Sequence, residues 1–378
     1  MKKINFLIAV LALILVGKSS YSQQEVPITT AVPVLTIAPD SRSGGMGDVG
    51  VAISPDANSQ FWNPAKYSFC KEDFGLSISH TPWLKQLIND MSISYLSGYK
   101  HLGTRQSFGV SLRYFSLGSI TYTSPLGTFL GEGKPHEYSI DGSYSLLLSP
   151  NMSGSVALRF IYSNLSTNIA VQGAGVSKPG IAFAGDLAFF YTKDLDISDK
   201  TGNLSFGVNI SNLGTKISYT DQGKEDFIPA NIRLGGAFTY DLDPYNKLLF
   251  ALDLNKLLVP TPIYGQQPND SISVATAMFT SFYDAPYGFS EELHELMISV
   301  GAEYWYNSKF ALRAGYFHEN QNKGNRKYFT TGIGLKFNVF SLDFSYLISL
   351  SQQNPLEGTM RFTLGFNFGA MKDTEKKL

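Results

Sequence analysis

The stretch PDSRSGGMGDVGVAISPDANSQFWNPAKYSF, residues Pro39–Phe69, has a composition unlike that of the rest of the chain. It is rich in small residues, and neither a helical pattern nor a two-residue alternation runs through it. Its glycines let the backbone pass close to other segments, its tryptophan can anchor on an apolar surface, and its Asn-Pro pair predicts a turn. Because the chain after Glu72 has the pattern of strands, we expect this stretch to fill or gate a closed barrel. The residues expected to form this plug include Gly45, Met46, Gly47, Trp62, Asn63 and Pro64.

Apolar residues alternate with small or polar residues from Phe74 almost to the end of the chain. A period of two is the period of a β-strand. Fourteen segments have the length that crosses an outer membrane, and aromatic residues often stand at their ends. The expected strands lie near residues 74–78, 91–95, 108–114, 138–148, 156–162, 181–191, 204–210, 232–240, 248–254, 296–304, 310–316, 329–337, 342–348 and 360–368.

Charged residues inside these segments fall on the face opposite to the apolar one. An outward-facing Arg or Lys at mid-depth of a bilayer costs about 2–4 kcal/mol, so we expect these charges to face the barrel interior. Their signs are mixed, which favours ion pairs packed against a plug over the lining of an ion-selective pore. The residues are Arg113, Asp141, Arg159, Asp186, Arg233, Asp253, Glu303, Arg313, Lys336, Asp343 and Arg361.

The connections between the expected strands alternate between long and short. Bacterial outer-membrane barrels have short periplasmic turns and long outer loops, and an even strand number leaves no open edge in lipid. A soluble sandwich has no reason to alternate in this way. We therefore expect an all-β transmembrane antiparallel barrel with a periplasmic N-terminus, in which Thr192–Gly202 is a somewhat long inner turn. The long connections include Ser116–His136, Asn164–Pro179, Gly214–Pro229 and Val259–Glu292.

The overall composition suits such a barrel. The chain has 378 residues and a formal net charge of −1, so no basic excess indicates nucleic acid as a partner. Aromatic residues make up 13% and charged residues only 16%, whereas soluble domains have about one quarter charged residues. The mean hydropathy of −0.04 is too polar for a helical membrane protein but fits a barrel with one apolar and one polar face.

Four regions are expected along the chain. Two lysines, an apolar run that ends at Val16, and small residues at Ser20 and Ser22 predict a secretory signal peptide over residues 1–22. Residues 23–71 would form the N-terminal periplasmic or plug segment, residues 72–369 the barrel, and residues 370–378 a periplasmic tail. The single cysteine, Cys70, excludes an internal disulfide.

No strong catalytic or metal-binding pattern occurs in the sequence. A Gly-x-Ser-x-Gly elbow is missing, and His136-Glu137 and His318-Glu319 lack the spacing of metal ligands. We therefore expect no catalytic residue, metal or cofactor. A lipid A deacylase stays open as an alternative, and it would need a Ser/His or His/Asp cluster near the outer rim. The histidines to map for such a cluster are His80, His136, His294 and His318.

Apolar side chains are concentrated in the long loops. Contiguous exposed apolar surface usually marks an interaction site, although these side chains could also fold inward and cap the barrel mouth. The candidate partner-binding residues are Trp83, Leu84, Ile120, Tyr122, Leu126, Phe129, Ile263, Tyr264, Met278, Phe279, Phe282, Tyr283, Tyr287 and Phe289.

The run from Asp40 to Lys66, DSRSGGMGDVGVAISPDANSQFWNPAK, carries a resemblance to a known family. Its glycine-methionine-glycine and Phe-Trp-Asn-Pro-Ala portions resemble the N-terminal signature of the FadL-like outer-membrane barrels. The full run resembles the PorV family, the barrel components of the type IX secretion system of Bacteroidetes.

The resemblance implies a non-enzymatic protein that is integral to the cell outer membrane and in contact with its lipid. Members of that family bind the C-terminal signal domain of secreted cargo at the translocon barrel SprA. They pass the cargo to the cell-surface attachment complex, which includes the sortase PorU. The second alternative is a FadL-like channel for hydrophobic small molecules, which predicts an apolar pocket inside the barrel and a lateral opening at a strand kink.

Overall fold

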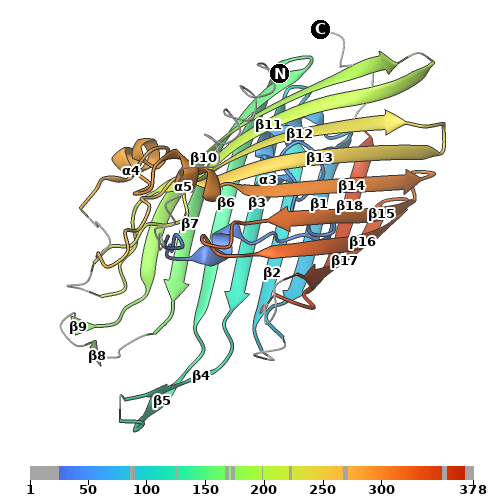
Figure 1. Ribbon diagram of the computed structural model, residues 1–378. Helices are drawn as coiled ribbons and strands as arrows, with labels where there is room; N and C mark the ends of the chain where they lie inside the picture. The colour runs from blue at the N-terminus through green and yellow to red at the C-terminus, as the bar shows by residue number, and fades with distance from the viewer. Residues whose placement is uncertain are drawn as a thin grey trace, which may run out of the picture.

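The computed structural model of the chain is a closed antiparallel β-barrel of fourteen strands (Figure 1). The structure describes residues 25–370 except 86–87, 89, 125, 167–169, 172–174, 198, 221–223, 267–270 and 351–355. The expected signal peptide over residues 1–22 and the tail beyond residue 370 lie outside the described residues. The expected fold class is confirmed, and each of the fourteen expected segments coincides with one barrel strand.

Neighbours in sequence are neighbours in the barrel, and the last strand closes against the first with Phe74 opposite Phe368. The barrel strands are β1 (Glu72–Pro82), β2 (Ser92–His101), β3 (Gln106–Ser116), β6 (His136–Ser149), β7 (Met152–Asn164), β10 (Gly180–Ile197), β11 (Lys200–Gly214), β12 (Asn231–Asp241), β13 (Asn246–Leu257), β14 (Met297–Tyr306), β15 (Phe310–His318), β16 (Lys327–Phe337), β17 (Phe340–Ser349) and β18 (Met360–Ala370).

Short elements occupy the loops and the N-terminal segment. Two small hairpins are formed by β4 (Ile120–Thr123) with β5 (Phe129–Gly133) and by β8 (Ala170–Val171) with β9 (Gly175–Val176). The helices are η1 (Pro33–Thr36), α2 (Ser41–Gly44), α3 (Ser59–Trp62), η2 (Pro64–Phe69), α4 (Val274–Thr280) and α5 (Phe289–His294), where η marks a 3₁₀-helix. Within the described residues, no helix is both long enough and apolar enough to cross a membrane.

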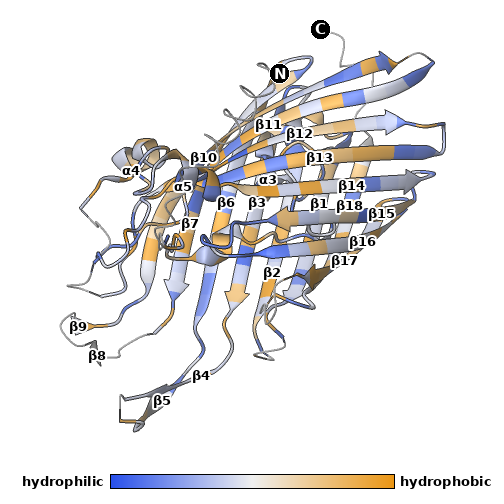
Figure 2. Cartoon of the chain, in the orientation of Figure 1, coloured by the Kyte–Doolittle hydropathy of each residue, from blue (hydrophilic) through white to orange (hydrophobic). Residues whose placement is uncertain are grey.

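The barrel wall has an apolar outer face and a polar inner face, because successive side chains of a strand point to opposite sides. On β6 the outward Ile140 is exposed while the adjacent Asp141 is buried in the lumen. Bands of orange alternate with pale and blue bands along strands such as β13 and β14 (Figure 2). This arrangement is the one that lipid outside and a packed interior require.

The two ends of the barrel differ, and the long loops all lie at one of them (Figure 1). By the rule for outer-membrane barrels, this is the outer end, and the short turns mark the periplasmic end. Most of Thr192–Gly202, which was expected to be a somewhat long inner turn, is paired β-strand in the structure. β10 and β11 stay paired as far as Ile197 and Lys200, so the hairpin extends past the neighbouring strands.

The N-terminal residues 25–71, which we call the lumen segment, run through the inside of the barrel from the outer end to the periplasmic end. At the outer end the Ala31 amide donates to the carbonyl of Phe227 in the β11–β12 loop. At the periplasmic end His101 Nε2 donates to the Cys70 carbonyl oxygen over 3.2 Å. The described start of the segment therefore lies at the outer end, and its C-terminal end lies at the periplasmic end.

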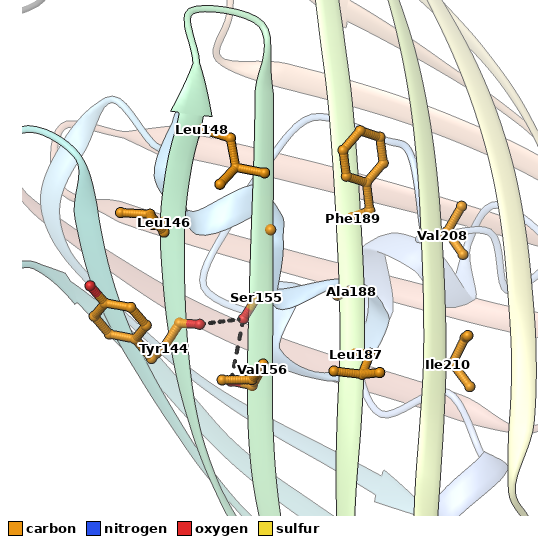
Figure 3. A pocket seen from close by; sticks show the side chains of 11 residues that line it. Tyr144, Leu146, Leu148, Ser155, Val156, Leu187, Ala188, Phe189, Val208 and Ile210 are labelled. Atoms are coloured by element: carbon orange, nitrogen blue, oxygen red, sulfur yellow. Dashed lines mark hydrogen bonds between the residues drawn. The ribbon is translucent and has the colours of Figure 1, made fainter.

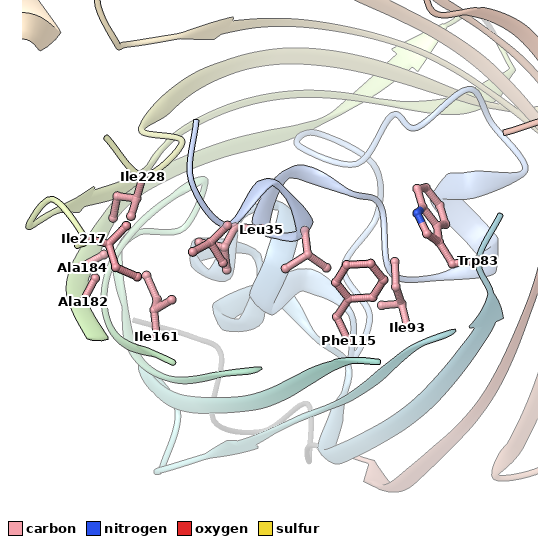
Figure 4. Close-up of a cluster of buried hydrophobic side chains, with 11 residues drawn as sticks. Leu35, Trp83, Ile93, Phe115, Ile161, Ala182, Ala184, Ile217 and Ile228 are labelled. Atoms are coloured by element: carbon pink, nitrogen blue, oxygen red, sulfur yellow. The ribbon is translucent and has the colours of Figure 1, made fainter. Parts of the chain in front are cut away.

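An apolar cluster holds the outer part of the lumen segment. Leu35 packs between Ile161 and its neighbours on one side and Phe115 and its neighbours on the other (Figure 4). The members come from the lumen segment, from four barrel strands and from two outer loops, so this contact ties the segment to much of the wall. The cluster comprises Val32, Val34, Leu35, Trp83, Ile93, Phe115, Ile161, Ala182, Ala184, Ile217 and Ile228.

Candidate functional site

The long β13–β14 loop carries two short helices at the outer end of the barrel. α4 begins after Ser273, whose hydroxyl oxygen accepts from the Thr276 amide over 3.1 Å and caps the helix. α5 begins after Gly288, where a φ of 72° lets the chain turn sharply into the helix. These local devices place a folded structure, rather than an extended loop, above the barrel mouth.

The aromatic side chains of this loop point into solvent. Phe279 is 72% exposed, Tyr283 71% and Phe289 76%, which is far more than a capped mouth would leave. Met278 is the exception, because it packs partly buried against Leu258 and Val259. We call the exposed set the aromatic loop surface; it comprises Ile263, Tyr264, Phe279, Phe282, Tyr283, Tyr287 and Phe289.

A buried group of charged side chains, which we call the buttress, supports this surface from below. Its members are Lys256, Lys323, Glu291, Glu292 and Glu295, and each is less than a tenth exposed. Lys256 Nζ lies 2.9 Å from Glu292 and 2.6 Å from Glu295, while Lys323 Nζ contacts both Glu291 and Glu295. Buried ions must be paired in this way, and the pairs fix α5 to the end of β13 and to the β15–β16 loop.

The same carboxylates order the turn in front of α5. Glu292 accepts from the Ala285 amide over 2.9 Å, and Glu291 accepts from the Tyr287 amide over 3.0 Å. Asp284 accepts from the Thr261 hydroxyl over 2.9 Å. Burial raises the pKa of the Asp284 carboxyl above its ordinary value, and the neighbouring carboxylates add to this effect against the hydrogen bonds from Thr261.

The start of the lumen segment lies against this platform. Glu25 accepts from His294 Nδ1 over 2.9 Å, and Lys323 Nζ donates to the Val26 carbonyl oxygen over 3.4 Å. The first described residues therefore contact both α5 and the buttress. This contact joins the lumen to the aromatic loop surface.

The β3–β6 loop projects away from the barrel as the β4–β5 hairpin (Figure 1). Leu126 at its tip is 93% exposed, and Phe129 and Ile120 are exposed as well. Tyr122 is half-buried and donates its hydroxyl to the Leu165 carbonyl oxygen over 3.1 Å. The hairpin therefore presents apolar side chains beside the next loop.

The first outer loop behaves differently from the other two. Trp83 is only 8% exposed and belongs to the apolar cluster that holds the lumen segment (Figure 4). Leu84 is half-buried and packs against the same cluster. These two side chains therefore support the interior and offer little surface to a partner.

The motif residues of the lumen segment fit closely against the inner wall. Met46 is fully buried, and a Cβ atom added to Gly315 would come within 2.0 Å of its carbonyl carbon. The Gly47 amide donates to Thr330 Oγ1 over 2.7 Å. Only a glycine in β15 allows this approach, and only a residue without a Cβ adopts the φ of 71° at Gly47 without strain.

The second half of the motif anchors the segment to β6, β7 and β10. Asn63 Nδ2 donates to the Phe189 carbonyl oxygen over 2.9 Å, and the Pro64 carbonyl accepts from Ser145 over 2.7 Å. Trp62 is 3% exposed, and its ring nitrogen donates to Asp40 over 3.2 Å. Serine hydroxyls on the inner wall thus donate to buried main-chain carbonyl groups of the lumen segment, which would otherwise lack a hydrogen-bond partner.

Ion pairs fill much of the remaining interior, as the mixed charges predicted. Arg42 of the lumen segment binds Glu303 over 2.8 Å and Asp56 over 2.9 Å. Arg313 binds the same Glu303 over 2.7 Å, and Arg159 binds two aspartates. Lys336 differs, because it lies half-buried near the periplasmic rim, 3.5 Å from Glu72.

The histidines are spread over separate environments. His80 pairs with Ser94 over 3.1 Å, His294 with Glu25, and His318 with the Tyr316 hydroxyl. His136 donates to the Lys134 carbonyl. In the part of the chain that the structure describes, no group of three or more His, Cys, Asp or Glu side chains is arranged so that it could hold a metal ion.

Comparison with known protein families shows the family to which the chain belongs. A family model described as type IX secretion system protein PorV matches residues 20–264. The chain belongs to this family. As a PorV-family protein it is a component of the type IX secretion system and an integral protein of the outer membrane.

Solved structures share the barrel fold at low sequence identity. The toluene transporter TodX of Pseudomonas putida matches with a TM-score of 0.51 and 10% identity, covering 89% of this chain and 99% of that one. The toluene transporter TbuX of Ralstonia pickettii matches with a TM-score of 0.47 and 12% identity over 89% and 99% of the chains. A FadL homologue of Pseudomonas aeruginosa matches with a TM-score of 0.44 and 12% identity over 91% and 100%. No curated protein sequence matches the chain.

Sequence reasoning missed the buttress of this PorV-family protein. The signal was present, because three glutamates fall within five residues at the end of a loop otherwise poor in charge. Their lysine partners come from β13 and from the β15–β16 loop, and such distant pairings cannot be read from spacing. Leu293, which is 49% exposed beside the aromatic loop surface, was also missed.

Proposed function

We propose that the protein is a non-enzymatic carrier that binds the C-terminal signal domain of type IX cargo through its outer loops. The observation that carries the proposal is the aromatic loop surface, held rigidly by the buttress. Aromatic side chains that are exposed but fixed bind a partner with little loss of conformational freedom. In this role the protein would collect cargo at the translocon barrel SprA and pass it to the attachment complex with the sortase PorU.

The filled lumen supports docking on the outside over transport through the inside. The lumen segment and the ion pairs around Arg42 and Glu303 occupy the space that a hydrophobic channel needs. A FadL-like channel would require an apolar pocket in this interior. The charged and hydrogen-bonded inner wall disfavours such a pocket.

A direct test is the binding of purified cargo signal domain to the detergent-solubilised barrel. Replacing Phe279, Phe282 and Tyr283 by Ser together should weaken binding by about a hundredfold, since each aromatic anchor of an interface contributes about 1 kcal/mol or more. Tyr245→Ser is the matched control, because Tyr245 is 60% exposed on a periplasmic turn. Both variants should keep the barrel folded, because all four replaced side chains are more than half exposed.

The cargo affinities of the loop variants distinguish docking on the aromatic loop surface from docking on the β4–β5 hairpin and from a channel function. Unchanged affinity in the triple variant would remove the aromatic loop surface from the proposal and leave the β4–β5 hairpin to be tested with Leu126→Ser and Phe129→Ser. If no loop variant alters cargo binding, while the purified barrel retains a hydrophobic small molecule, the channel alternative is favoured instead.

A further inference from the structure

A groove lies on the outside of the barrel wall, in its periplasmic half. It has a volume of about 460 Å³, and its lining comes from β6, β7, β10 and β11. Leu146 and Leu148 stand on one side and Phe189 on the other (Figure 3). The lining is apolar apart from the Tyr144 hydroxyl and Ser155, whose hydroxyl donates to the Tyr144 carbonyl oxygen over 2.9 Å. The groove therefore suits an apolar occupant.

The groove exists because one position in a row of large outward side chains is glycine. Across the sheet, Leu146 pairs with Gly154, Gly154 with Phe189, and Phe189 with Val208. A Cβ atom added to Gly154 would have its nearest neighbour at 3.5 Å, so a larger residue would fit. No backbone requirement explains the glycine, since its φ lies outside the left-handed region.

The position of the groove decides what covers it. Outward side chains of a transmembrane barrel face hydrocarbon, so the groove opens toward the acyl chains of the bilayer and not toward water. An empty hollow there would forfeit dispersion contacts on every side chain that lines it. Leu146 and Phe189 stand two strand spacings apart, about 10 Å, and their side chains leave a gap of acyl-chain width between them.

A positively charged side chain lies where the headgroup would be if a lipid placed one of its acyl chains in the groove. Lys193 continues the outward row of Leu187, Phe189 and Tyr191, and it is exposed. Tyr191 pairs with Met152, the first residue of β7, so Lys193 lies level with the short periplasmic turn that marks the membrane boundary. Lys193 lies four residue positions beyond Phe189 along β10, about 13 Å, which matches the reach from a phosphate into the upper acyl chain.

We propose that this groove is a binding site for one phospholipid of the periplasmic leaflet, with an acyl chain over Gly154 and the phosphate beside Lys193. The proposal is independent of cargo docking, because the groove and the aromatic loop surface lie at opposite ends of the barrel.

The test uses the full barrel in lipid nanodiscs that contain phosphatidylglycerol with a photoactivatable group in one acyl chain. After illumination, mass spectrometry locates the labelled residues. Labelling should concentrate on Leu146, Val156 and Phe189, and Gly154→Leu, which fills the groove, should lower it there by about tenfold. Gly236→Leu is the matched control, since Gly236 also faces outward and has room for a side chain on β12.

A second pair of variants tests the headgroup contact. Lys193→Gln should reduce the retention of phosphatidylglycerol relative to phosphatidylcholine in native mass spectrometry, whereas Lys309→Gln, an exposed lysine on a distant periplasmic turn, should not. Labelling spread evenly around the wall, or unchanged in Gly154→Leu, would overturn the proposal. A cross-link from this groove to another protein in native outer membranes would overturn it in favour of a protein contact.

Discussion

Glu303 connects two distant parts of the chain through one carboxylate. It accepts from Arg42 of the lumen segment over 2.8 Å and from Arg313 of β15 over 2.7 Å, and it is 1% exposed. Removing a buried carboxylate that lies between two guanidinium groups should strongly destabilise the folded barrel, because each guanidinium then loses one of its partners. One side chain therefore fastens the interior to the wall.

Glu303→Gln should destabilise the barrel by about 3–5 kcal/mol, the usual cost of breaking a buried ion pair. The glutamine keeps the volume but not the charge that Arg42 and Arg313 require. The measurement is the urea concentration at which the barrel unfolds in lipid vesicles. Asp73→Asn is the control: it breaks the exposed pair with Lys100, at 3.3 Å, and should shift the midpoint little. Equal shifts in the two variants would contradict the argument.

Asp284 should make the outer loop sensitive to pH. Its pKa is raised in the folded loop, so folding favours the neutral carboxyl over the charged one. The folded loop is then most stable below the unfolded-state value near 4 and loses stability as the pH rises through the raised value. Glu292, Glu295 and Lys256 are the other charged groups around it.

Hydrogen exchange of residues 259–296, corrected for the intrinsic pH dependence of exchange, should therefore be faster at pH 8 than at pH 5. Asp284→Asn keeps the oxygen that accepts from Thr261 and should remove most of the difference. A variant that retains the full pH dependence would assign the effect to one of the glutamates instead.

At the scale of elements, α5 depends on lysines from outside its own loop. Lys323 contacts Glu291 and Glu295 of the α5 region and the Val26 carbonyl of the lumen segment. A helix of six residues has almost no stability of its own, so these contacts hold it in place. The docking platform is thus stabilised by tertiary contacts.

Lys323→Met should loosen α5 while leaving the barrel intact. Methionine has a similar length but cannot pair with the two glutamates, so Glu291 would lose its pair with Lys323 and Glu295 would keep its pair with Lys256. Hydrogen exchange in residues 289–296 should rise, and cargo should bind less tightly. Lys309→Met is the control, and faster exchange across the barrel strands themselves would show that the substitution acts on the whole fold instead.

The strands could be predicted from the sequence because their signal is local. Phe108, Val110 and Leu112 alternate with small residues whatever lies elsewhere, and lipid outside demands that alternation. The exposed aromatic residues of the β13–β14 loop were also visible as a concentration of apolar residues. The burial of Trp83, the extension of β10 and β11, and the position of Glu25 at the outer end depend on partners far away in sequence, which periodicity does not report.

For the whole molecule, the filled interior predicts that the barrel conducts almost no ions. In planar lipid bilayers, the purified protein should insert without passing a steady current of the size that a porin passes. The reason is that the lumen segment crosses the interior and is joined to the wall by the ion pairs Arg42–Glu303 and Arg361–Asp48. A general porin added at the same concentration is the control, and sustained channel currents from the wild-type protein would contradict the filled lumen.

The enclosed lumen segment also constrains the order in which the molecule is built. Its residues contact strands on opposite sides of the ring, including Thr330 on β16 and Ser145 on β6. The ring closes where β1 pairs with β18, and β18 leaves the ribosome last. A segment that fits so tightly cannot enter a barrel that has already closed. It must therefore lie against the concave face of the open sheet before β1 pairs with β18. Residues 25–71 would then act as a template on which β18 closes the ring.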